Sequence, residues 1–505
     1  MKRILFLILV SWISYHAKIS GQDTLVLSCE DAVGIALGQS YTIKSHELRK
    51  QEMHHFYQYN RAMFKPRLDM SLNLPLWNEF VNRIEQPDGL PVYNTYSSLE
   101  IGGDMSFRYI LPTGGNVAFS TNLFRNDLST LVTSTDTKIY TEQFYSRFWV
   151  SFAQPVFTKN KLRENLNEAE YKYEQAEHYF TRAQMDIVYE VTQGFYSLYQ
   201  AVMEEEIARE KLENSEESYR IAVLKSESGR IPRADVLSAE VSVSRDQASL
   251  LQARNKLMNE QEKFVHLIGL DLKQPVKILT TLDYPTFIID DQKAIEEALK
   301  NRLEIKEGEL DISLQNIELD RAKREREFSG SISAYYDLTG VSTLGEGKTP
   351  ELIRSSFEDI SNRPHNRGIA FTISFPIYDW GRGREKVNEA KIGLKEKELY
   401  LENLKISIRR EVEEVIRNVR ESRAQIEIHE KTLELARKSY NISRMRYENG
   451  DISSQELAVE REALAGIQLE YLDAFIGYQL AVNNLKRKTM WDFENNRSYL
   501  VGNTD

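Results

Sequence analysis

The sequence YRIAVLKSESGRIPRADVLSAE at residues 219–240 returns in altered form as YNISRMRYENGDISSQELAVER at residues 440–461. In each stretch a helix-forming segment reaches a glycine, Gly229 or Gly450, and a second helix-forming segment follows almost at once. Glycine after a run of helix formers is the usual helix stop, because it adopts the left-handed backbone without strain. Each stretch therefore predicts the tip of a helical hairpin.

The start of the second helix is also marked in both stretches. Pro232 suits the first position of a helix, where its missing N–H costs nothing. Ser453 and Glu456 have the spacing of a capping box, in which each side chain bonds the backbone N–H of the other residue.

The similarity between the two stretches belongs to a much longer repeat. At an offset of 221 positions Pro155 corresponds to Pro376, and matches continue without a gap as far as Ile231 and Ile452. A repeat of this length indicates a duplicated domain and not a solenoid unit. The expected divisions are a signal peptide at 1–21, a first repeat at 22–269, an equatorial linker at 270–292, a second repeat at 293–488 and a tail at 489–505.

Proline-free stretches predict helices of unusual length. Residues 159–229 would form one helix of about 105 Å at ~1.5 Å per residue, and 380–449 would match it. Two pairs of shorter predicted helices, with the members of each pair stacked end to end, would each match one long helix in length. The pairs are 30–64 with 232–269, and 293–327 with 452–488. Four columns of about 100 Å are too long for a globular core and imply a tube or a coiled coil.

Between the helices the apolar period changes from 3.6 to 2, which indicates strands. Six segments of about ten residues alternate apolar and polar side chains, and Trp77, Tyr109, Trp149, Tyr378 and Trp380 lie near their ends. This pattern is typical of an outer-membrane barrel with aromatic girdles, although each strand alone fits a soluble β-sandwich equally well. Because an open six-stranded sheet would leave polar edges in lipid, the barrel must close between subunits. The segments are 67–77, 99–111, 115–124, 144–157, 329–338 and 369–377.

The N-terminus has the form of a secretory signal peptide. A basic start, an apolar run from Ile4 to Ile13 and a small-residue exit predict cleavage after Gly21, and no later segment is apolar enough for a membrane-spanning helix. Cleavage changes the net charge from −11 to −14, which disfavours nucleic acid as a partner. The single cysteine, Cys29, allows no disulfide within the chain and is predicted to be a buried helix residue and not a lipid anchor.

This order of elements resembles the TolC family of outer-membrane efflux ducts across nearly all of the mature chain. The most specific resemblances are Asp235 to Glu240 after the first tip, Tyr447 to Gly450 at the second tip, and the strand-to-helix junctions at 154–157 and 375–381. The resemblance implies an α+β membrane protein, a homotrimer with one shared β-barrel and a periplasmic α-helical barrel of twelve columns. It implies an exit duct in a Gram-negative outer membrane for drugs, toxins or polypeptides, without cofactor or catalysis. A periplasmic adaptor and an inner-membrane transporter would be its partners.

The hairpin at 99–124 departs from that family pattern of two strands in each half. If it joins the barrel, three chains supply eighteen strands. The tight turn at 112–115 would then fall on the periplasmic side, and the polar segments 78–98 and 125–143 would form outer loops.

The hairpin tips are the candidate functional site. The resemblance places the acid six residues after the tip glycine, here Asp235 or Glu456, near a periplasmic constriction. Arg230 and Arg233 would pair with those acids, although charged residues at a helix start are common for reasons of the helix dipole alone. The residues expected to form the tip turns and contact an adaptor are Gly229, Ile231, Pro232, Gly450, Asp451 and Ile452.

No catalytic constellation stands out in the sequence. His46, His54 and His55 lack the spacing and partners of a metal site, so we interpret them as exposed helix residues. The alternative from another class is a periplasmic adaptor built on one long coiled-coil hairpin, which would have no need of a 221-residue duplication or ten-residue strands.

Overall fold

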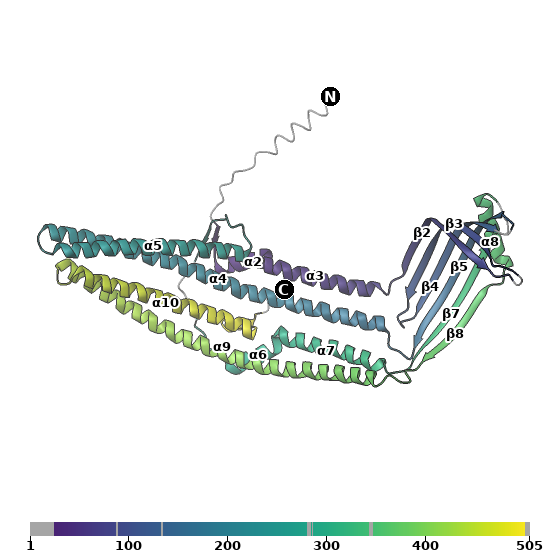
Figure 1. Cartoon of the computed structure of the whole chain (residues 1–505). Helices are drawn as coiled ribbons and strands as arrows, with labels where there is room; N and C mark the ends of the chain where they lie inside the picture. The colour runs from purple at the N-terminus through teal and green to yellow at the C-terminus, as the bar shows by residue number, and fades with distance from the viewer. Residues whose placement is uncertain are drawn as a thin grey trace, which may run out of the picture. The chain divides into compact units, whose positions relative to one another are not determined.

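The computed structural model describes residues 25–86, 89–132, 135–279, 284, 286–342 and 347–499, so the expected signal peptide lies outside the described residues. The chain divides into two compact units, each with segments from both predicted repeats (Figure 1). The helical unit comprises Met1–Lys50, Ala176–Glu309 and Leu399–Asp505, and the sheet unit comprises Gln51–Gln175 and Leu310–Glu398.

The two hairpins of the helical unit have matching dimensions. The long helices α4 (Lys161–Glu227) and α9 (Arg382–Asn449) have 67 and 68 residues, and their partners α5 (Arg233–Ile268) and α10 (Ser454–Thr489) have 36 each. Both pairs run side by side in Figure 1. The predicted hairpins, and the internal repeat from which they arise, are confirmed.

The shorter helices differ from the prediction. Residues 30–64 form α2 (Cys29–Gln39) and α3 (Tyr41–Ala62) and not one helix. Residues 293–327 likewise form α6 (Asp291–Asn301) and α7 (Leu303–Arg324).

One extended residue separates each pair of shorter helices. Ser40 has ψ 144° and Arg302 has ψ 124°, and they lie 262 positions apart, at matching places in the two repeats. The break lets Ser40 Oγ accept a hydrogen bond from Ile43 N at 3.2 Å, which caps the next helix. The buried guanidinium of Arg302 pairs with Glu304 at 2.7 Å and with Glu411.

The main core of the helical unit lies where α2, α4 and α5 meet. Cys29 is the first residue of α2 and packs against this core, half-buried, with Sγ 3.8 Å from Thr192 Oγ1. Burial raises the pKa of its thiol. The predicted helical position is therefore correct, whereas the predicted burial is only partial. Two small sheets complete the described part of the unit: β1 (Leu25–Leu27) with β6 (Val276–Ile278), and β9 (Trp491–Asp492) with β10 (Arg497–Ser498).

The sheet unit contains one antiparallel six-stranded sheet in the order β2-β3-β4-β5-β7-β8. The hairpin that departs from the family pattern supplies β3 and β4, so it belongs to the same sheet as the other four strands. The strands are β2 (Arg67–Ile84), β3 (Val92–Ile110), β4 (Asn116–Val132), β5 (Thr137–Val156), β7 (Ser329–Val341) and β8 (Asn366–Ser374).

The first four strands are longer than the alternation predicted, with 18, 19, 17 and 20 residues. The predicted loops at 78–98 and 125–143 are therefore wrong for most of their length, because β2 to β5 continue through them. Backbone pairing does not depend on an apolar face, so the strands stay in register through their polar segments. Asn94 on β3 pairs with Val132 on β4, and Val132 pairs with Thr137 on β5.

The tight turn at 112–115 forms as predicted. Leu111 N donates to Gly115 O at 2.7 Å, and Gly114 adopts φ 89°. Asn160, directly before α4, donates from Nδ2 to Pro112 O at 2.9 Å. The turn therefore lies at the end of the sheet from which α4 starts.

The sheet has one apolar and one polar face, which follow from its register. One row across the apolar face contains Leu68, Phe107, Phe119, Val150 and Tyr336 and ends at Arg367 on β8. The adjacent row across the polar face contains Asp69, Ser106, Ser120, Trp149, Asp337 and Asn366.

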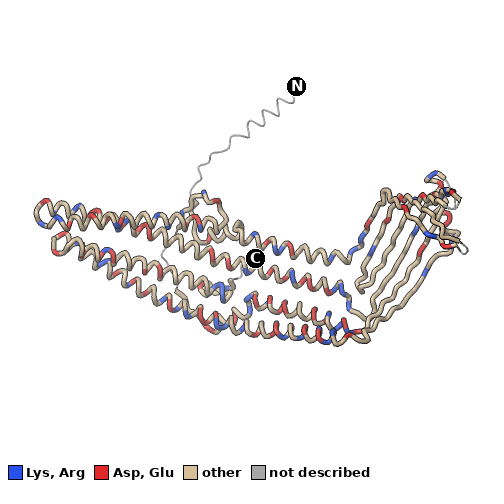
Figure 2. The backbone as a smooth tube through the Cα atoms, viewed as in Figure 1, with Lys and Arg blue, Asp and Glu red and all other residues tan. Residues whose placement is uncertain are grey.

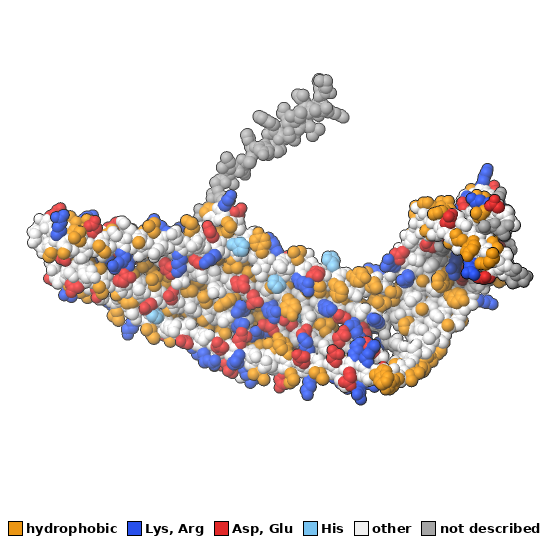
Figure 3. Space-filling view, viewed as in Figure 1, with side chains coloured by type: hydrophobic (Ala, Val, Ile, Leu, Met, Phe, Trp, Pro, Cys, Tyr) orange, Lys and Arg blue, Asp and Glu red, His pale blue; other side chains and the backbone are white. Residues whose placement is uncertain are grey.

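Apolar side chains on the first of these faces are exposed in the single chain. Leu68 is 65% exposed, Met70 69% and Ile369 84%. Hydrophobic side chains also gather where β8 leads into α9 (Figure 3), and the exposed residues there include Phe375, Ile377, Tyr378 and Trp380.

The connection between β7 and β8 contains a helix that the sequence analysis did not predict. This helix, α8 (Thr349–Asn362), buries Leu352, Ser356 and Asp359 on one side. It packs against β5 and β7.

Candidate functional site

The two hairpin tips use the same turn. Gly229 (φ 72°) and Gly450 (φ 91°) are left-handed, as their position after a helix requires. In the first tip Arg230 N donates to Lys225 O at 2.9 Å, and Gly229 N donates to Ser226 O at 3.0 Å. The second tip repeats both bonds, which together form the Schellman motif.

The predicted capping box at the start of α10 is present in full. Glu456 N donates to Ser453 Oγ at 3.2 Å, and Ser453 N donates to the Glu456 carboxylate at 2.8 Å. The Ser453 hydroxyl also donates to this carboxylate, at 2.9 Å, and the two bonds from Ser453, the backbone N–H first, lower the pKa of Glu456. In the first tip Pro232 is the N-cap of α5 and lies one residue before the first helical position that was predicted for it.

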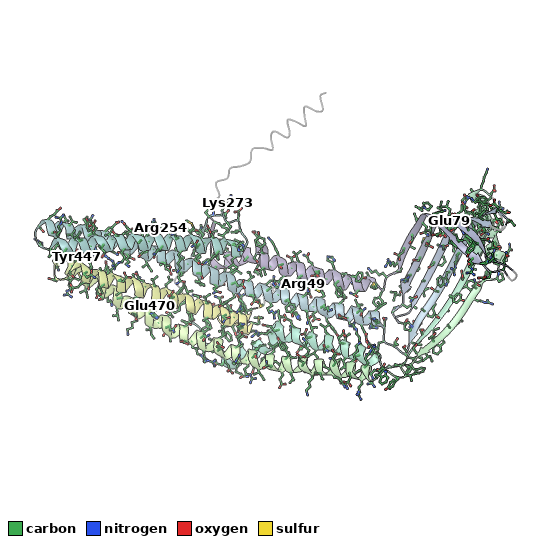
Figure 4. All side chains as sticks on the ribbon, in the orientation of Figure 1. Arg49, Glu79, Arg254, Lys273, Tyr447 and Glu470 are labelled. Carbon is green, nitrogen blue, oxygen red and sulfur yellow. The ribbon has the colours of Figure 1, made fainter. Side chains whose placement is uncertain are left out.

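The two tips touch one another within the chain. Lys225 on α4 donates to the Tyr447 carbonyl oxygen, and its Nζ lies 4.5 Å from the centre of the Tyr447 ring. Tyr447 Oη in turn donates to Ser218 O at 2.9 Å. Figure 4 shows Tyr447 near the tip end of the hairpins, far from Glu470 along the same hairpin. Burial, with a smaller effect from Arg230, lowers the pKa of Lys225.

A second contact joins the starts of α5 and α10. Ser454 Oγ donates to Asp235 O at 3.3 Å, and Asp235 also raises the pKa of Tyr447, although burial has the larger effect. Apolar side chains from both hairpins pack beneath these polar contacts: Ile221 from the first, and Tyr440, Tyr447, Ile452, Leu457 and Leu464 from the second.

Farther along the hairpins a buried charged cluster connects three helices. Asp246 on α5 is 2% exposed, and its carboxylate lies 3.3 Å from Lys211 Nζ on α4 and 3.4 Å from Arg461 Nη2 on α10. Lys211 also pairs with Glu462 on α10. Because a buried charge needs its partners, this cluster holds the second hairpin against the first.

The predicted gate residues all lie at the tips, but the single chain does not bring them together. Arg230 and Arg233 are exposed and form no ion pair with any residue that the structure describes. Glu456 bonds to its own cap, and Asp235 contributes its backbone oxygen to the contact between hairpins. Of the predicted turn residues, Gly229, Gly450 and Asp451 are exposed, whereas Ile231 and Ile452 are half-buried.

The sequence analysis missed Lys225, Ser218 and the buried cluster, and it gave Tyr447 no role. A usable signal was the difference between the repeats. At the 221-residue offset Asp246 corresponds to Ile467 and Lys211 to Thr432. A charge in one repeat that corresponds to an uncharged residue in the other indicates a contact between the repeats.

Other chemistry finds little support in the described part of the chain. The His54 ring packs edge-on against Tyr173 at 5.2 Å, and no described group of three His, Cys, Asp or Glu side chains could hold a metal ion. Acidic and basic residues alternate along the helices, as Figure 2 shows. None of the described helices is both long enough and apolar enough to cross a bilayer.

Comparison with known proteins identifies the family. The profile of the outer membrane efflux protein family matches residues 118–270 and 294–489. The CmeC channel of Campylobacter jejuni has 14% identity and a TM-score of 0.68, over 93% of this chain and 87% of that one.

Two further channels have the same fold. VceC of Vibrio cholerae has 13% identity and a TM-score of 0.63, over 91% of this chain and 95% of its own. The open state of MtrE from Neisseria gonorrhoeae has 14% identity and a TM-score of 0.63, over 91% of this chain and 88% of its own. A search of curated protein sequences gives no significant match. The chain belongs to the outer membrane efflux protein family and is an exit duct of the outer membrane.

Proposed function

We propose that three copies of this chain form one passive duct, with an eighteen-stranded barrel in the outer membrane and a helical tube in the periplasm. The observation that carries the proposal is the six-stranded sheet with one apolar face and two unpaired edge strands, β2 and β8. Lipid cannot satisfy the free N–H and C=O groups of such edges.

Pairing between copies would satisfy both edges. The strands alternate in direction across the sheet, so β2 and β8 run oppositely, and β8 of one copy would pair antiparallel with β2 of the next. Three copies would thereby give an even number of strands in an antiparallel barrel. Residues 22–269 and 293–488 would act as the two duplicated halves of each subunit.

The hairpin tips would close the periplasmic end of the duct. In each copy Lys225 and Tyr447 hold the second hairpin against the first, and separation of the hairpins would break both of their contacts. Around a threefold axis Arg230 and Arg233 would face Asp235 and Glu456 of a neighbouring copy. Each exposed pair would contribute at most about 1 kcal/mol, so closure would need several together.

Such a duct would work with partners and without chemistry of its own. A periplasmic adaptor would engage the tips, where the exposed residues include Gly229, Pro232, Gly450 and Asp451, and an inner-membrane transporter would supply the substrate. A periplasmic adaptor as the identity of this chain is the weaker alternative, because an adaptor has no use for an apolar sheet face of this size.

Fractionation tests the location and the gate variants test the closure. The full chain should remain in the outer membrane after a carbonate wash, and release with the periplasmic fraction would refute the proposal. Arg230→Ala and Arg233→Ala should raise resting conductance in planar bilayers. Asp235→Asn with Glu456→Gln should do so as well and should reduce cation preference. If these variants conduct and select like the parent, the tip charges serve only the helix ends.

A further inference from the structure

The helix α8 lies on the same face of the sheet as the exposed apolar side chains. Ser356 Oγ lies 2.6 Å from Ser146 Oγ, and the ring of Phe357 lies 5.9 Å from that of Phe148. Gly340 is so close to the helix that an added Cβ would come within 2.0 Å of Ser356 O. Ser146, Phe148 and Gly340 all belong to the apolar face by the register of β5 and β7.

The helix runs across several strands and not along one. At its start Thr349 Oγ1 accepts a hydrogen bond at 2.7 Å from Arg125 on β4. Toward its end Asp359 accepts a hydrogen bond from Val341 N on β7 at 2.9 Å. The helix thus extends from β4 over β5 to β7. It meets β7 near Val341, past Asp337, the last residue of β7 that pairs with β8.

The position of α8 along the strands coincides with the outer limit of the apolar band. From Gly330 to Gly340, the ten residue-to-residue steps of β7 span about 33 Å, or about 25 Å along the axis of a barrel with the usual strand tilt. The apolar band of outer-membrane barrels is also about 25 Å tall. At this level charged side chains appear on the face in β4 and β5, where Arg125 pairs with Asp127 at 2.7 Å and with Glu142 at 3.2 Å. The neighbouring positions on β3, Ile101 and Leu99, are still apolar.

The outward side of α8 is charged and acidic on balance, with Glu351, Arg354 and Glu358 exposed. Arg354 and Glu358 form an exposed pair at 2.8 Å, with side chains 84% and 62% exposed. Beside them Phe357 is 43% exposed and points along the sheet toward the apolar band. A charged side above an apolar side that rests at a membrane boundary is the arrangement of helices that lie in the lipid interface.

We propose that α8 is an interfacial helix on the outside of the barrel, where its outward side binds the headgroup region of the outer lipid leaflet. The proposal rests on the barrel proposed above. The helix would fix the height of the duct in the membrane and would cover the part of β7 that β8 leaves unpaired. Its partner is the lipid surface itself, and contact with a neighbouring copy is the competing outcome.

Spin labels on single cysteines test the proposal. In a Cys29→Ser background, labels would be placed by Phe357→Cys on α8, Ile369→Cys on the apolar face and Thr372→Cys on the polar face. The full-length protein would be studied in dimyristoyl phosphatidylcholine vesicles, with oxygen as the lipid-soluble relaxant and a nickel chelate as the water-soluble one.

The ratio of oxygen accessibility to nickel accessibility should be highest for the label at position 369, intermediate at 357 and lowest at 372. The label at 357 should report a depth of about 12 Å from the bilayer centre, half the height of the apolar band. A label at 357 that behaves like the one at 372 would place α8 in water and overturn the inference. Protection of 357 from both relaxants would also overturn it, in favour of contact with a neighbouring copy. If 369 itself behaves like 372, the barrel proposal fails, which is a separate outcome.

Discussion

Removal of the Lys225 ammonium should loosen the contact between the two hairpin tips. Lys225 donates to the Tyr447 carbonyl and lies 4.5 Å from the centre of its ring, so Lys225→Met removes both interactions and keeps the apolar stem. At a half-exposed position the charge-assisted hydrogen bond and the cation–π contact together contribute about 1.5 kcal/mol. Three copies that open together would lose about 4.5 kcal/mol, which lowers the closed-to-open ratio by about a thousandfold at 1.4 kcal/mol for each factor of ten.

Planar-bilayer recording at low voltage measures this effect as resting conductance. The matched control is Lys263→Met, because Lys263 pairs with Glu260 at 2.6 Å on the same helix, α5. We expect a large rise in open probability for Lys225→Met and none for the control. Parental conductance in Lys225→Met, with correct assembly, would refute the assignment of this contact to closure.

Three further changes test other parts of the structure. Asp246→Asn leaves Arg461 buried without its anion, which should cost about 3 kcal/mol of stability and raise the rate of amide hydrogen exchange along α10. Unchanged exchange would contradict the role of the cluster in holding the two hairpins together. In the folded chain the pKa of the Glu456 carboxyl lies below its ordinary value of about 4.3. The cap should therefore stabilise the tip fully above pH ~4.3, and this stabilisation should be lost as the pH falls through the lower pKa of the folded state. In pH-corrected hydrogen exchange, Glu456→Gln should abolish that acid-dependent fraying, and persistence of the fraying would assign it to another group. Gly450→Ala should destabilise the second tip by about 1 kcal/mol, because alanine is strained at φ 91°, and a neutral effect in proteolysis at the tip would contradict this.

The sequence predicted the long helices because their signals are local and repeated. Two proline-free stretches that end in Gly229 and Gly450 leave little freedom, and α4 and α9 start and stop within a few residues of the prediction. The breaks at Ser40 and Arg302 escaped notice because neither is a glycine or a proline. The Ser40 cap is local, because its acceptor bonds Ile43 N, whereas the buried ion pair of Arg302 with Glu411 forms only when distant segments meet.

Strand existence was predictable and strand length was not. Alternation marks only the part of each strand that has an apolar face, so β2 to β5 continue where the pattern stops. The helix α8 was missed although Leu352, Ile353, Phe357 and Ile360 have helical spacing, because its 14 residues lie between two segments that were interpreted only as strands.

The candidate site at the tips stays a prediction, and the contacts that the tips make within the chain were not predicted. Sequence patterns identified Glu456 as part of a capping box, and the structure adds that its carboxylate already has a partner there. The contact between Lys225 and Tyr447 joins unmatched positions of the two repeats. A comparison of aligned positions therefore could not find it.

The central claim is that three chains close one eighteen-stranded barrel through β2 and β8, and disulfide cross-linking between these edge strands tests it most directly. In a Cys29→Ser background, Ser71→Cys on β2 would be combined in turn with Ala370→Cys, Thr372→Cys or Ser374→Cys on β8, all on the polar face. The claim predicts that oxidation in native outer membranes gives, for at least one pair, a ladder on denaturing gels that ends at three chains. Only monomer for every pair, or a ladder that continues beyond three chains, would contradict it.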